Sequence, residues 1–310
     1  MPGVDTESMS GDIPPVNFVL GVGAQKAGST WLHHFLSFHP EVHIGPIKEY
    51  HVWDTFFLGG AELRRANLER RLASLGEGPV RNTRSALPVS VEKARANLFM
   101  VQFLRDHPGE YAQHFVDLAR SRPGIKAVAD ITPSYALLDA PAYSHIQGVL
   151  ESTGFVVRPV FILRDPVSRV ISAYDMYRRR WNPKSDPNAR NNPAPLEEFA
   201  TWASVRRRTD YQHTVEGLEK SFNADGIFFG LFETFFTRET IGRLLEFLDI
   251  SWTEPPVEHP RNKSRTGFRA TKQQRQMLRE SYADAYNFCF QHFPDWDLEQ
   301  LWRDPSSVDD

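Results

Sequence analysis

One stretch near the N-terminus constrains the fold of this chain more than any other. An apolar run from Asn17 to Val22 has the character of a buried parallel strand, and it ends in a glycine loop, Gly23 to Gly28. A helical pattern follows the loop, with four apolar residues on one face: Trp31, Leu32, Phe35 and Leu36. This order gathers backbone N–H groups at a helix N-terminus, where they can hold a phosphate.

Strands and helices continue to alternate along the rest of the chain. Three further apolar runs rich in β-formers predict strands at 125–129, 158–163 and 227–232. Helical patterns follow them, one capped by Asp165 with Pro166 in its first turn, and others at 241–248 and 271–291. This alternation predicts an α/β fold in which helices cover both faces of a central parallel sheet.

Length and composition narrow the class of protein. We predict a disordered lead-in at 1–15 and a single domain at 16–310, with lid-like insertions near 71–90 and 181–195. A net charge of −3 argues against a general nucleic-acid binder. The single cysteine, Cys289, excludes an intrachain disulfide, and no run approaches the ~18 apolar residues of a membrane span. We therefore expect a cytoplasmic protein, and the sequence leaves its oligomeric state open.

The glycine loop differs from that of a nucleotide kinase. A kinase loop reads G-x-x-x-x-G-K-[ST], with a lysine directly after the second glycine. Here Ser29 follows Gly28, and a lysine lies inside the loop instead, at Lys26. The missing lysine would weaken the binding of a triphosphate, which argues against a kinase. A P-loop kinase for a small metabolite is kept as an alternative hypothesis, and a nucleotide-binding module without catalysis is another.

A second motif follows the predicted strand at 158–163. It reads Arg164-Asp165-Pro166-x-x-Arg169-x-x-Ser172, on a strand end and the first turns of a helix. Arg164 is expected at the carboxyl edge of the sheet, where open α/β folds bind their ligands. Arg169 and Ser172 are three residues apart, so we expect them on one helix face. An arginine and a hydroxyl on one phosphate are a common way to hold a dianion.

Together, the two motifs resemble those of sulfotransferases that use 3′-phosphoadenosine 5′-phosphosulfate (PAPS). The first reads K-x-G-[ST]-[ST]-W-L from Lys26, and further landmarks lie at 132–135, 247–250 and 262–268. The resemblance implies a P-loop NTPase-like sulfotransferase fold and transfer of a sulfuryl group to a hydroxyl or amine, with release of 3′-phosphoadenosine 5′-phosphate (PAP) and no required metal.

The resemblance also implies which residues bind PAPS. The 5′-phosphosulfate side falls on Gln25, Lys26, Ala27, Gly28, Ser29, Thr30 and Trp31. Lys26 would stabilise the leaving phosphate. Arg164 and Ser172 would hold the 3′-phosphate. A basic loop near the C-terminus resembles the family's N-K-x-K-G-F loop with one extra residue, and it adds Lys263, Arg265 and Gly267 to the 3′-phosphate side.

A third segment implies which residue acts as the general base of the transfer. Residues 48–54, K-E-Y-H-V-W-D, resemble the K-E-P-x-F-F-D segment of the heparan-sulfate-type branch. This match implies Glu49 as general base, with His51 and Asp54 in support, and Lys48 beside Glu49 or on the sulfuryl oxygens. Whether Glu49 or His51 is the base stays open. A positioned carboxylate contributes about 10²–10⁴-fold to such a transfer.

One position departs from that branch and affects the acceptor. The branch often shows E-K-[ST]-P-x-Y, whereas this chain has Ile131 in place of the lysine. A sulfated polysaccharide acceptor is therefore in doubt, as is a mechanism that needs two lysines. Asp130 and Tyr135 are candidates for the acceptor side, together with Asp54. A small molecule or a glycan fits, and nucleic acid is not expected as a partner.

Overall fold

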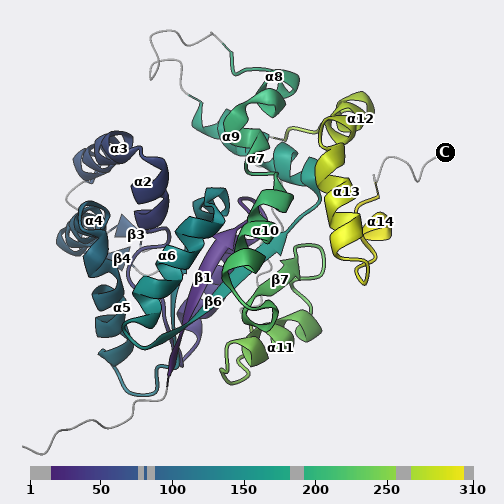
Figure 1. Cartoon of the computed structure of the whole chain (residues 1–310). Coiled ribbons are helices and arrows are strands. Elements are labelled where there is room, and N and C mark those ends of the chain that lie inside the picture. Colours follow the sequence, from purple (N-terminus) through teal and green to yellow (C-terminus); the bar gives the residue numbers. More distant parts are fainter. Residues whose placement is uncertain (1–14, 76–79, 82–87, 182–191, 256–266, 304–310) are drawn as a thin grey trace, which may run out of the picture.

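Five parallel strands form the centre of the molecule, in the order β2-β5-β1-β6-β7 (Figure 1). The structure is a computed structural model that describes residues 15–75, 80–81, 88–181, 192–255 and 267–303. The strands of the sheet are β1 (Val16–Gly23), β2 (Val42–His43), β5 (Ala127–Ile131), β6 (Phe155–Leu163) and β7 (Phe228–Leu231). The four longer strands overlap the four runs predicted from the sequence, so the predicted α/β fold with a parallel sheet is confirmed.

The strand β1 is buried along almost its whole length because it lies in the middle of the sheet. It pairs with β5 on one side and β6 on the other. Every residue from Asn17 to Gly23 is buried. Gly21 allows the close approach of β5, since a Cβ atom there would lie 2.6 Å from the Cδ1 atom of Ile131. The continuous apolar run of the sequence reflects this central position.

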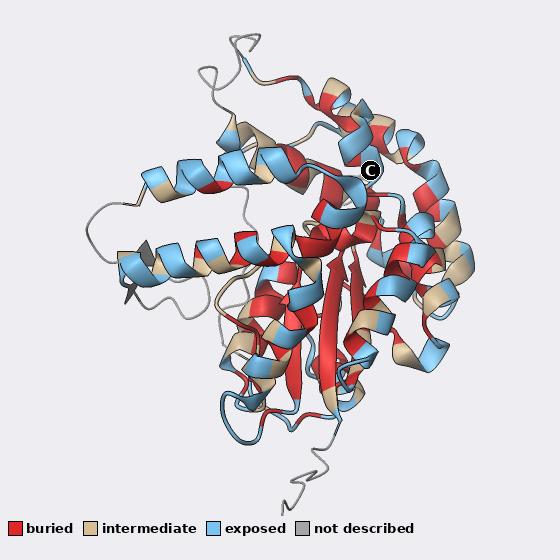
Figure 2. Ribbon diagram, turned by 60° about the vertical axis from the view of Figure 1, so that its left-hand side comes forward, coloured by how far each residue is buried: buried red, intermediate tan, exposed pale blue. Residues whose placement is uncertain are grey.

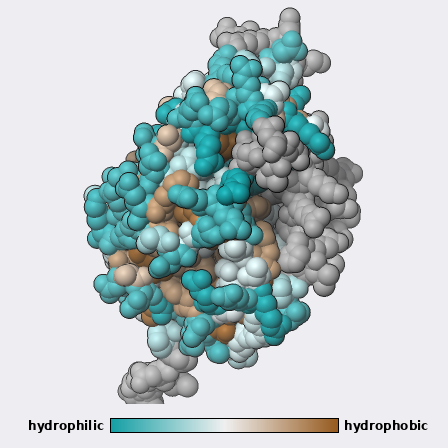
Figure 3. All heavy atoms as spheres, turned by 90° about the vertical axis from the view of Figure 1, so that its right-hand side faces the viewer, coloured by the Kyte–Doolittle hydropathy of each residue, from teal (hydrophilic) through white to brown (hydrophobic). Residues whose placement is uncertain are grey.

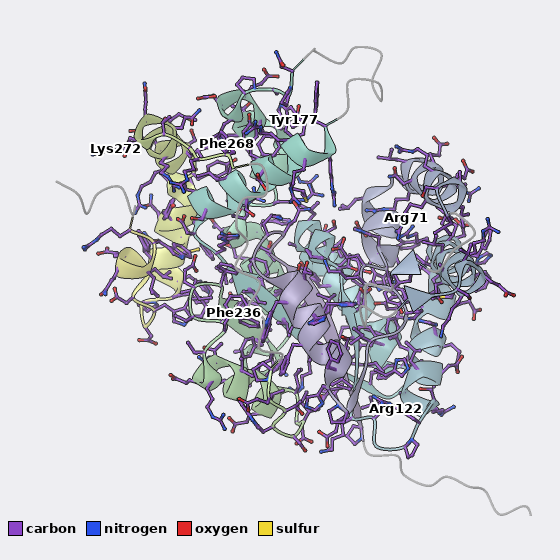
Figure 4. All side chains as sticks on the ribbon, turned by 180° about the vertical axis from the view of Figure 1, so that it is seen from behind. Arg71, Arg122, Tyr177, Phe236, Phe268 and Lys272 are labelled. Atoms are coloured by element: carbon purple, nitrogen blue, oxygen red, sulfur yellow. The ribbon has the colours of Figure 1, made fainter. Side chains whose placement is uncertain are left out.

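Helices cover both faces of the sheet. Figure 1 shows α6 and α10 in front of it, and Figure 4, from behind, shows α1 over the opposite face. The α-helices are α1 (Ser29–Phe38), α2 (Val52–Leu58), α3 (Ala61–Ala73), α4 (Val91–Asp106), α5 (Tyr111–Arg120), α6 (Ala140–Glu151), α7 (Pro166–Arg180), α8 (Leu196–Thr201), α9 (Ala203–Arg206), α10 (Tyr211–Ser221), α11 (Arg238–Phe247), α12 (Lys272–Ser281), α13 (Ala283–His292) and α14 (Leu298–Leu301). Short 3₁₀ turns lie at η1 (Pro108–Glu110), η2 (Pro133–Leu137) and η4 (Ala224–Gly226).

The long helix predicted at 271–291 is wrong in one respect, since the chain forms two helices there. The break between α12 and α13 lies at Tyr282, whose φ and ψ of −115° and 21° are not helical. Its ring is buried, and its hydroxyl donates to the carbonyl of Ala200 at 2.7 Å. On either side of the break, α12 buries Leu278, and α13 buries Ala285, Tyr286 and Cys289.

Two helices project from the body of the molecule. They are α3 and α4, and Figure 2 colours most residues along their projecting part as exposed or intermediate. The insertion predicted near 71–90 lies here, but its first residues belong to α3, and a short antiparallel pair lies within it, β3 (Val80–Arg81) with β4 (Pro88–Val89). The second insertion, near 181–195, falls largely outside the described residues. Their action as lids stays a prediction.

The surface on the side of α11 to α14 is mixed. Figure 3 shows hydrophobic side chains interspersed among hydrophilic ones on that face. Such a mixture is ordinary for a globular domain, because polar atoms cannot cover its whole surface. Within the described parts of the chain, no helix combines the length and the apolar composition that crossing a membrane requires.

Candidate active site

A cavity of about 560 Å³ opens at the carboxyl edge of the sheet. Three segments that are far apart in the sequence meet in it: the loop after β1, the segment after β2, and the end of β6 with α7. The lining residues that the sequence predicted are Gln25, Lys26, Gly28, Ser29, Thr30, Trp31, Lys48, Glu49, Arg164 and Ser172. These segments meet because β1 is hydrogen-bonded to β6 on one side and to β5 on the other, and β5 pairs with β2.

The loop after β1 is shaped by left-handed backbone. Gly28 has φ 93° and Lys26 has φ 75°, a conformation that is uncommon for a residue other than glycine. Helix α1 begins at Ser29 without a side-chain cap. Ser29 and Thr30, the first two residues of α1, line the cavity together with Lys26. The first N–H groups of a helix have no partner within it. The assignment of an anion to this loop stays a prediction.

Arg164 connects the loop to the end of β6. Its Nη1 donates to the carbonyl of Lys26 at 2.7 Å, and its guanidinium lies over the ring of Phe232, 4.3 Å from the centroid. Its Nε is buried and has no hydrogen-bond partner among the described residues. A buried cationic donor without a partner is costly, which makes a bound anion the natural partner for it.

Helix α7 begins as the sequence predicted and then separates two residues that were expected together. Asp165 caps it by accepting from the N–H of Ser168 at 2.8 Å, and Pro166 lies in the first turn. Ser172 lines the cavity, but Arg169 is fully buried on another side of the helix, where its Nη2 donates to the carbonyl of Val205 at 3.2 Å. The expectation that Arg169 and Ser172 share one face toward the ligand is therefore wrong.

The segment after β2 carries a chain of charged groups. Glu49 accepts from Lys48 Nζ at 2.7 Å and lies 3.3 Å from His51 Nε2. His51 Nδ1 lies 2.9 Å from Asp54 Oδ2, and Arg64 pairs with the same carboxylate oxygen. The N–H of Tyr50 donates to Thr132 Oγ1 at 3.0 Å, and this bond holds the segment against the end of β5. Lys48 and Glu49 line the cavity, whereas the buried Asp54 lies behind His51.

Charges around these groups shift their pKa values in opposite directions. Burial alone would raise the pKa of Glu49, but the hydrogen bond from His51 and the charge of Lys48 lower it to about 2. Burial alone would lower the pKa of His51, but its bonds with Asp54 and Glu49 raise it. Burial, together with the charges of Arg179 and Arg164, lowers the pKa of Lys26 to about 8. Glu49 is thus ionised at neutral pH, and Lys26 titrates just above it.

Two of the predicted acceptor-side residues lie in the core. Asp130 and Tyr135 are both fully buried and do not line the cavity. Asp130 accepts hydrogen bonds from the hydroxyls of Tyr111, Thr132 and Tyr135 at 2.8, 2.6 and 2.8 Å. Burial raises the pKa of this carboxyl to about 6, although the three hydroxyls oppose the shift. Pro133 and Ser134, between them in the sequence, do line the cavity.

The remaining predicted residues divide between core, surface and the part outside the description. Ala27, within the loop after β1, is fully buried. Trp31 packs in the core against Phe35, Phe235 and Phe236, and one side of it reaches the cavity. Gly267 is exposed, with φ 71°, and its neighbour Phe268 lines the cavity instead. Lys263 and Arg265 lie outside the described residues.

Sequence reasoning missed several residues that line the cavity. Those on or after α7 are Ser168, Asp175, Arg179 and Arg275, and the aromatic ones are Phe232, Phe236 and Phe268. Phe268 packs against Tyr174 of α7, with ring centroids 4.9 Å apart, and Phe236 packs against Trp31 at 5.2 Å. Figure 4 labels both phenylalanines. A signal for three of them was available, because positions 168, 172, 175 and 179 follow one another at three- and four-residue intervals on one face of a helix.

No cluster of three or more His, Cys, Asp or Glu side chains that could hold a metal ion occurs among the residues that the structure describes.

Comparison with known proteins gives a family match and a fold match. A family model described as the sulfotransferase family matches residues 18–254. A solved sulfotransferase from Alicyclobacillus acidocaldarius is similar to this chain with a TM-score of 0.58 and 19% identity, and the match covers 94% of this chain and 100% of that one. At this identity, the likeness supports a shared fold. No curated protein matched the chain by sequence.

Two other solved structures are more distant. A sulfotransferase domain of the Synechococcus PCC 7002 olefin synthase has a TM-score of 0.43 and 18% identity, over 87% of this chain and 94% of that one. A mouse sulfotransferase solved in complex with PAP has a TM-score of 0.42 and 10% identity, over 93% of this chain and 88% of that one.

Proposed function

The chain belongs to the sulfotransferase family, and from this membership we propose that it transfers a sulfuryl group from PAPS to a hydroxyl or amine of a small-molecule or glycan acceptor. PAP is released. The observation that carries the proposal is the single cavity in which the phosphate loop, Arg164 with Ser172, and the Lys48–Glu49 pair meet. A protein that merely kept the fold would not need both Lys26 and Glu49 in the lining of the same cavity.

The cavity fits a nucleotide of this kind. Its volume, about 560 Å³, lies in the range of ligand sites. Arg164 Nε is a buried donor without a partner in the described chain, and Ser168 and Ser172 lie on the neighbouring turns of α7. We assign these groups to the 3′-phosphate. The N-terminus of α1 and Lys26 would hold the 5′ side, and the rings of Trp31, Phe232 and Phe236 offer apolar surface for a base.

The residues divide the chemical work between a cation and a carboxylate. PAPS supplies a sulfuryl group attached to a good leaving group, the 5′-phosphate. Lys26 places a positive charge where negative charge develops on that phosphate as the S–O bond breaks. Glu49 accepts the proton of the acceptor hydroxyl. An incoming hydroxyl replaces one of the hydrogen bonds from Lys48 or His51, and the basicity of Glu49 rises when it loses that donor.

The test is nucleotide binding measured by calorimetry, followed by turnover with labelled PAPS and an extract as the source of acceptor. We expect PAP to bind without magnesium. Lys26→Ala should keep the fold and lose about 10²–10³ in rate, because one preorganised donor to the developing charge is gone. Binding of ATP that depends on magnesium, with no binding of PAP, would instead identify a kinase. Full turnover by Lys26→Ala would remove Lys26 from the leaving group.

A further inference from the structure

Arg179 lies near the end of α7 and faces the cavity from a position that no motif singled out. Its side chain is anchored through one nitrogen. Arg179 Nε lies 3.3 Å from Asp175 Oδ2, and it also donates to the carbonyl of Asp175 at 3.4 Å. Both acceptors belong to Asp175, one turn earlier in α7, so the Nε edge of the guanidinium is held against the helix.

The other two nitrogens of this guanidinium have no hydrogen-bond partner within the described ranges of the chain. About a third of the side chain, 33%, is exposed. A guanidinium held at Nε presents its two Nη groups as a planar pair of donors, which matches two oxygens of one oxyanion. The geometry therefore leaves a two-pronged anion site open toward the cavity.

The position of Arg179 along the helix separates it from the 3′-phosphate. It lies seven residues beyond Ser172, which is about 10 Å further along an α-helix. It lines the same cavity as Lys26, and its charge is the largest of the charges that lower the pKa of Lys26. These two observations favour a place for Arg179 on the 5′ side of the nucleotide, near the acceptor.

Two other described residues are poor candidates for a second cation near the sulfuryl group. Ile131, which stands where related sequences carry a lysine, is buried against Gly21 in the sheet and carries no charge. Lys48 is paired with Glu49.

Arg164, Arg179 and Arg180 all line the cavity and carry charges that lower the pKa of Lys26. Among these three, Arg179 is the one whose guanidinium is anchored through Nε, with both Nη groups left over.

We propose that Arg179 binds two non-bridging oxygens of the sulfuryl group during its transfer, as the second cation beside Lys26. This inference rests on the proposed function. As the bond from sulfur to the 5′-phosphate breaks, its electron pair stays on the phosphate beside Lys26. A new bond forms between sulfur and the acceptor oxygen, whose proton passes to Glu49. The sulfuryl oxygens stay negative throughout, and Arg179 holds them.

The test compares two nucleotides that differ only in the sulfuryl group. PAPS and PAP are titrated into wild type, Arg179→Gln and Arg179→Lys by calorimetry in the absence of acceptor. Arg179→Gln should weaken PAPS about 10- to 100-fold, because hydrogen bonds to a charged group are lost, and leave PAP within about twofold. Arg179→Lys should give an intermediate loss for PAPS, since it keeps the charge and loses the fork.

Arg178→Gln is the matched control. It removes the same charge one residue earlier, from a side chain that lies over the rings of Tyr174 and Phe268. It should leave both nucleotide affinities within about twofold. Circular dichroism establishes that each variant is folded.

Two results of the titration would overturn the proposal: an equal loss for PAPS and PAP, or no loss for either. In a separate turnover assay with Arg179→Gln, a loss confined to the KM of the acceptor would also overturn it. The last result would place Arg179 on an anionic acceptor instead. If wild type binds neither nucleotide, the proposed function itself fails, and the two failures are thereby distinguished.

Discussion

Two carboxylates, one at the end of a strand and one in the segment after the neighbouring strand, show how differently the fold uses the same chemical group. Asp130 lies near the end of β5, and Glu49 follows β2, which pairs with β5. Asp130 is fully buried and accepts from three neutral hydroxyls. Glu49 has 35% of its side chain exposed and is bonded to Lys48 and His51.

The donors decide the protonation of each carboxylate. Neutral hydroxyls cannot offset burial, so the pKa of Asp130 rises to about 6. Cationic partners more than offset it at Glu49, whose pKa falls to about 2. Thr132 links the two sites, since its Oγ1 donates to Asp130 and accepts from the N–H of Tyr50. We infer that Asp130 stabilises the segment of residues 48–54, and we propose that Glu49 acts as the general base.

The largest expected effect is on kcat, which should fall when Glu49 is changed and much less when Asp130 is changed. Glu49→Gln keeps the shape and removes the basicity, so kcat should fall about 10²–10⁴-fold while PAP affinity barely changes. Asp130→Asn should lower kcat far less in the folded protein. Single-turnover measurements with labelled PAPS check both variants. Normal turnover by Glu49→Gln, together with a dead His51→Ala, would make His51 the base and break the comparison.

The next effect separates them by stability. Asp130→Ala leaves three buried hydroxyls without their acceptor, which should lower the free energy of unfolding by about 3 kcal/mol or more. Glu49→Ala should change it little, because a partly exposed ion pair contributes little. Denaturant unfolding followed by circular dichroism measures both. If Asp130→Ala does not fold, Tyr135→Phe removes one of the three hydroxyls that donate to Asp130, and its expected loss is about 1 kcal/mol or more.

The two carboxylates should also give stability the opposite dependence on pH. For Asp130, the folded state binds a proton that the unfolded state has lost between about pH 4 and pH 6, so stability falls by about 1 to 3 kcal/mol as pH rises through that window. For Glu49, stability falls as pH drops below its ordinary pKa toward about 2. Unfolding curves of wild type and Asp130→Asn at several pH values isolate the first effect. A flat difference between them would contradict the raised pKa of Asp130.

The smallest expected effect is that of a chelator. We expect EDTA to leave kcat unchanged within about twofold, because the cations Lys26, Arg164 and Arg179 would meet the charges that magnesium meets in phosphoryl transfer. An activity abolished by EDTA and restored by magnesium would contradict this expectation, because a metal would then be needed in addition to these cations and Glu49.

Local features of the fold and of the cofactor side were predictable from the sequence. The period of apolar residues and the glycines of the first loop act through neighbouring backbone, so they predicted β1, the loop and the start of α1. The Asp165–Pro166 start of α7 is equally local, and its cap is confirmed. The match of motifs predicted the family because each motif is a contiguous segment that forms one part of the cavity.

The tertiary structure decided what depends on partners far away in the sequence. Asp130 and Tyr135 stood beside a recognisable motif, yet strand pairing and the hydroxyl of Tyr111 placed them in the core. Arg169 turned away from the ligand because Val205 accepts from it on another side of α7. Arg179 and Lys26 line the same cavity because β6 lies next to β1 in the sheet. The order of strands is set by long-range packing, and no local pattern of residues records it.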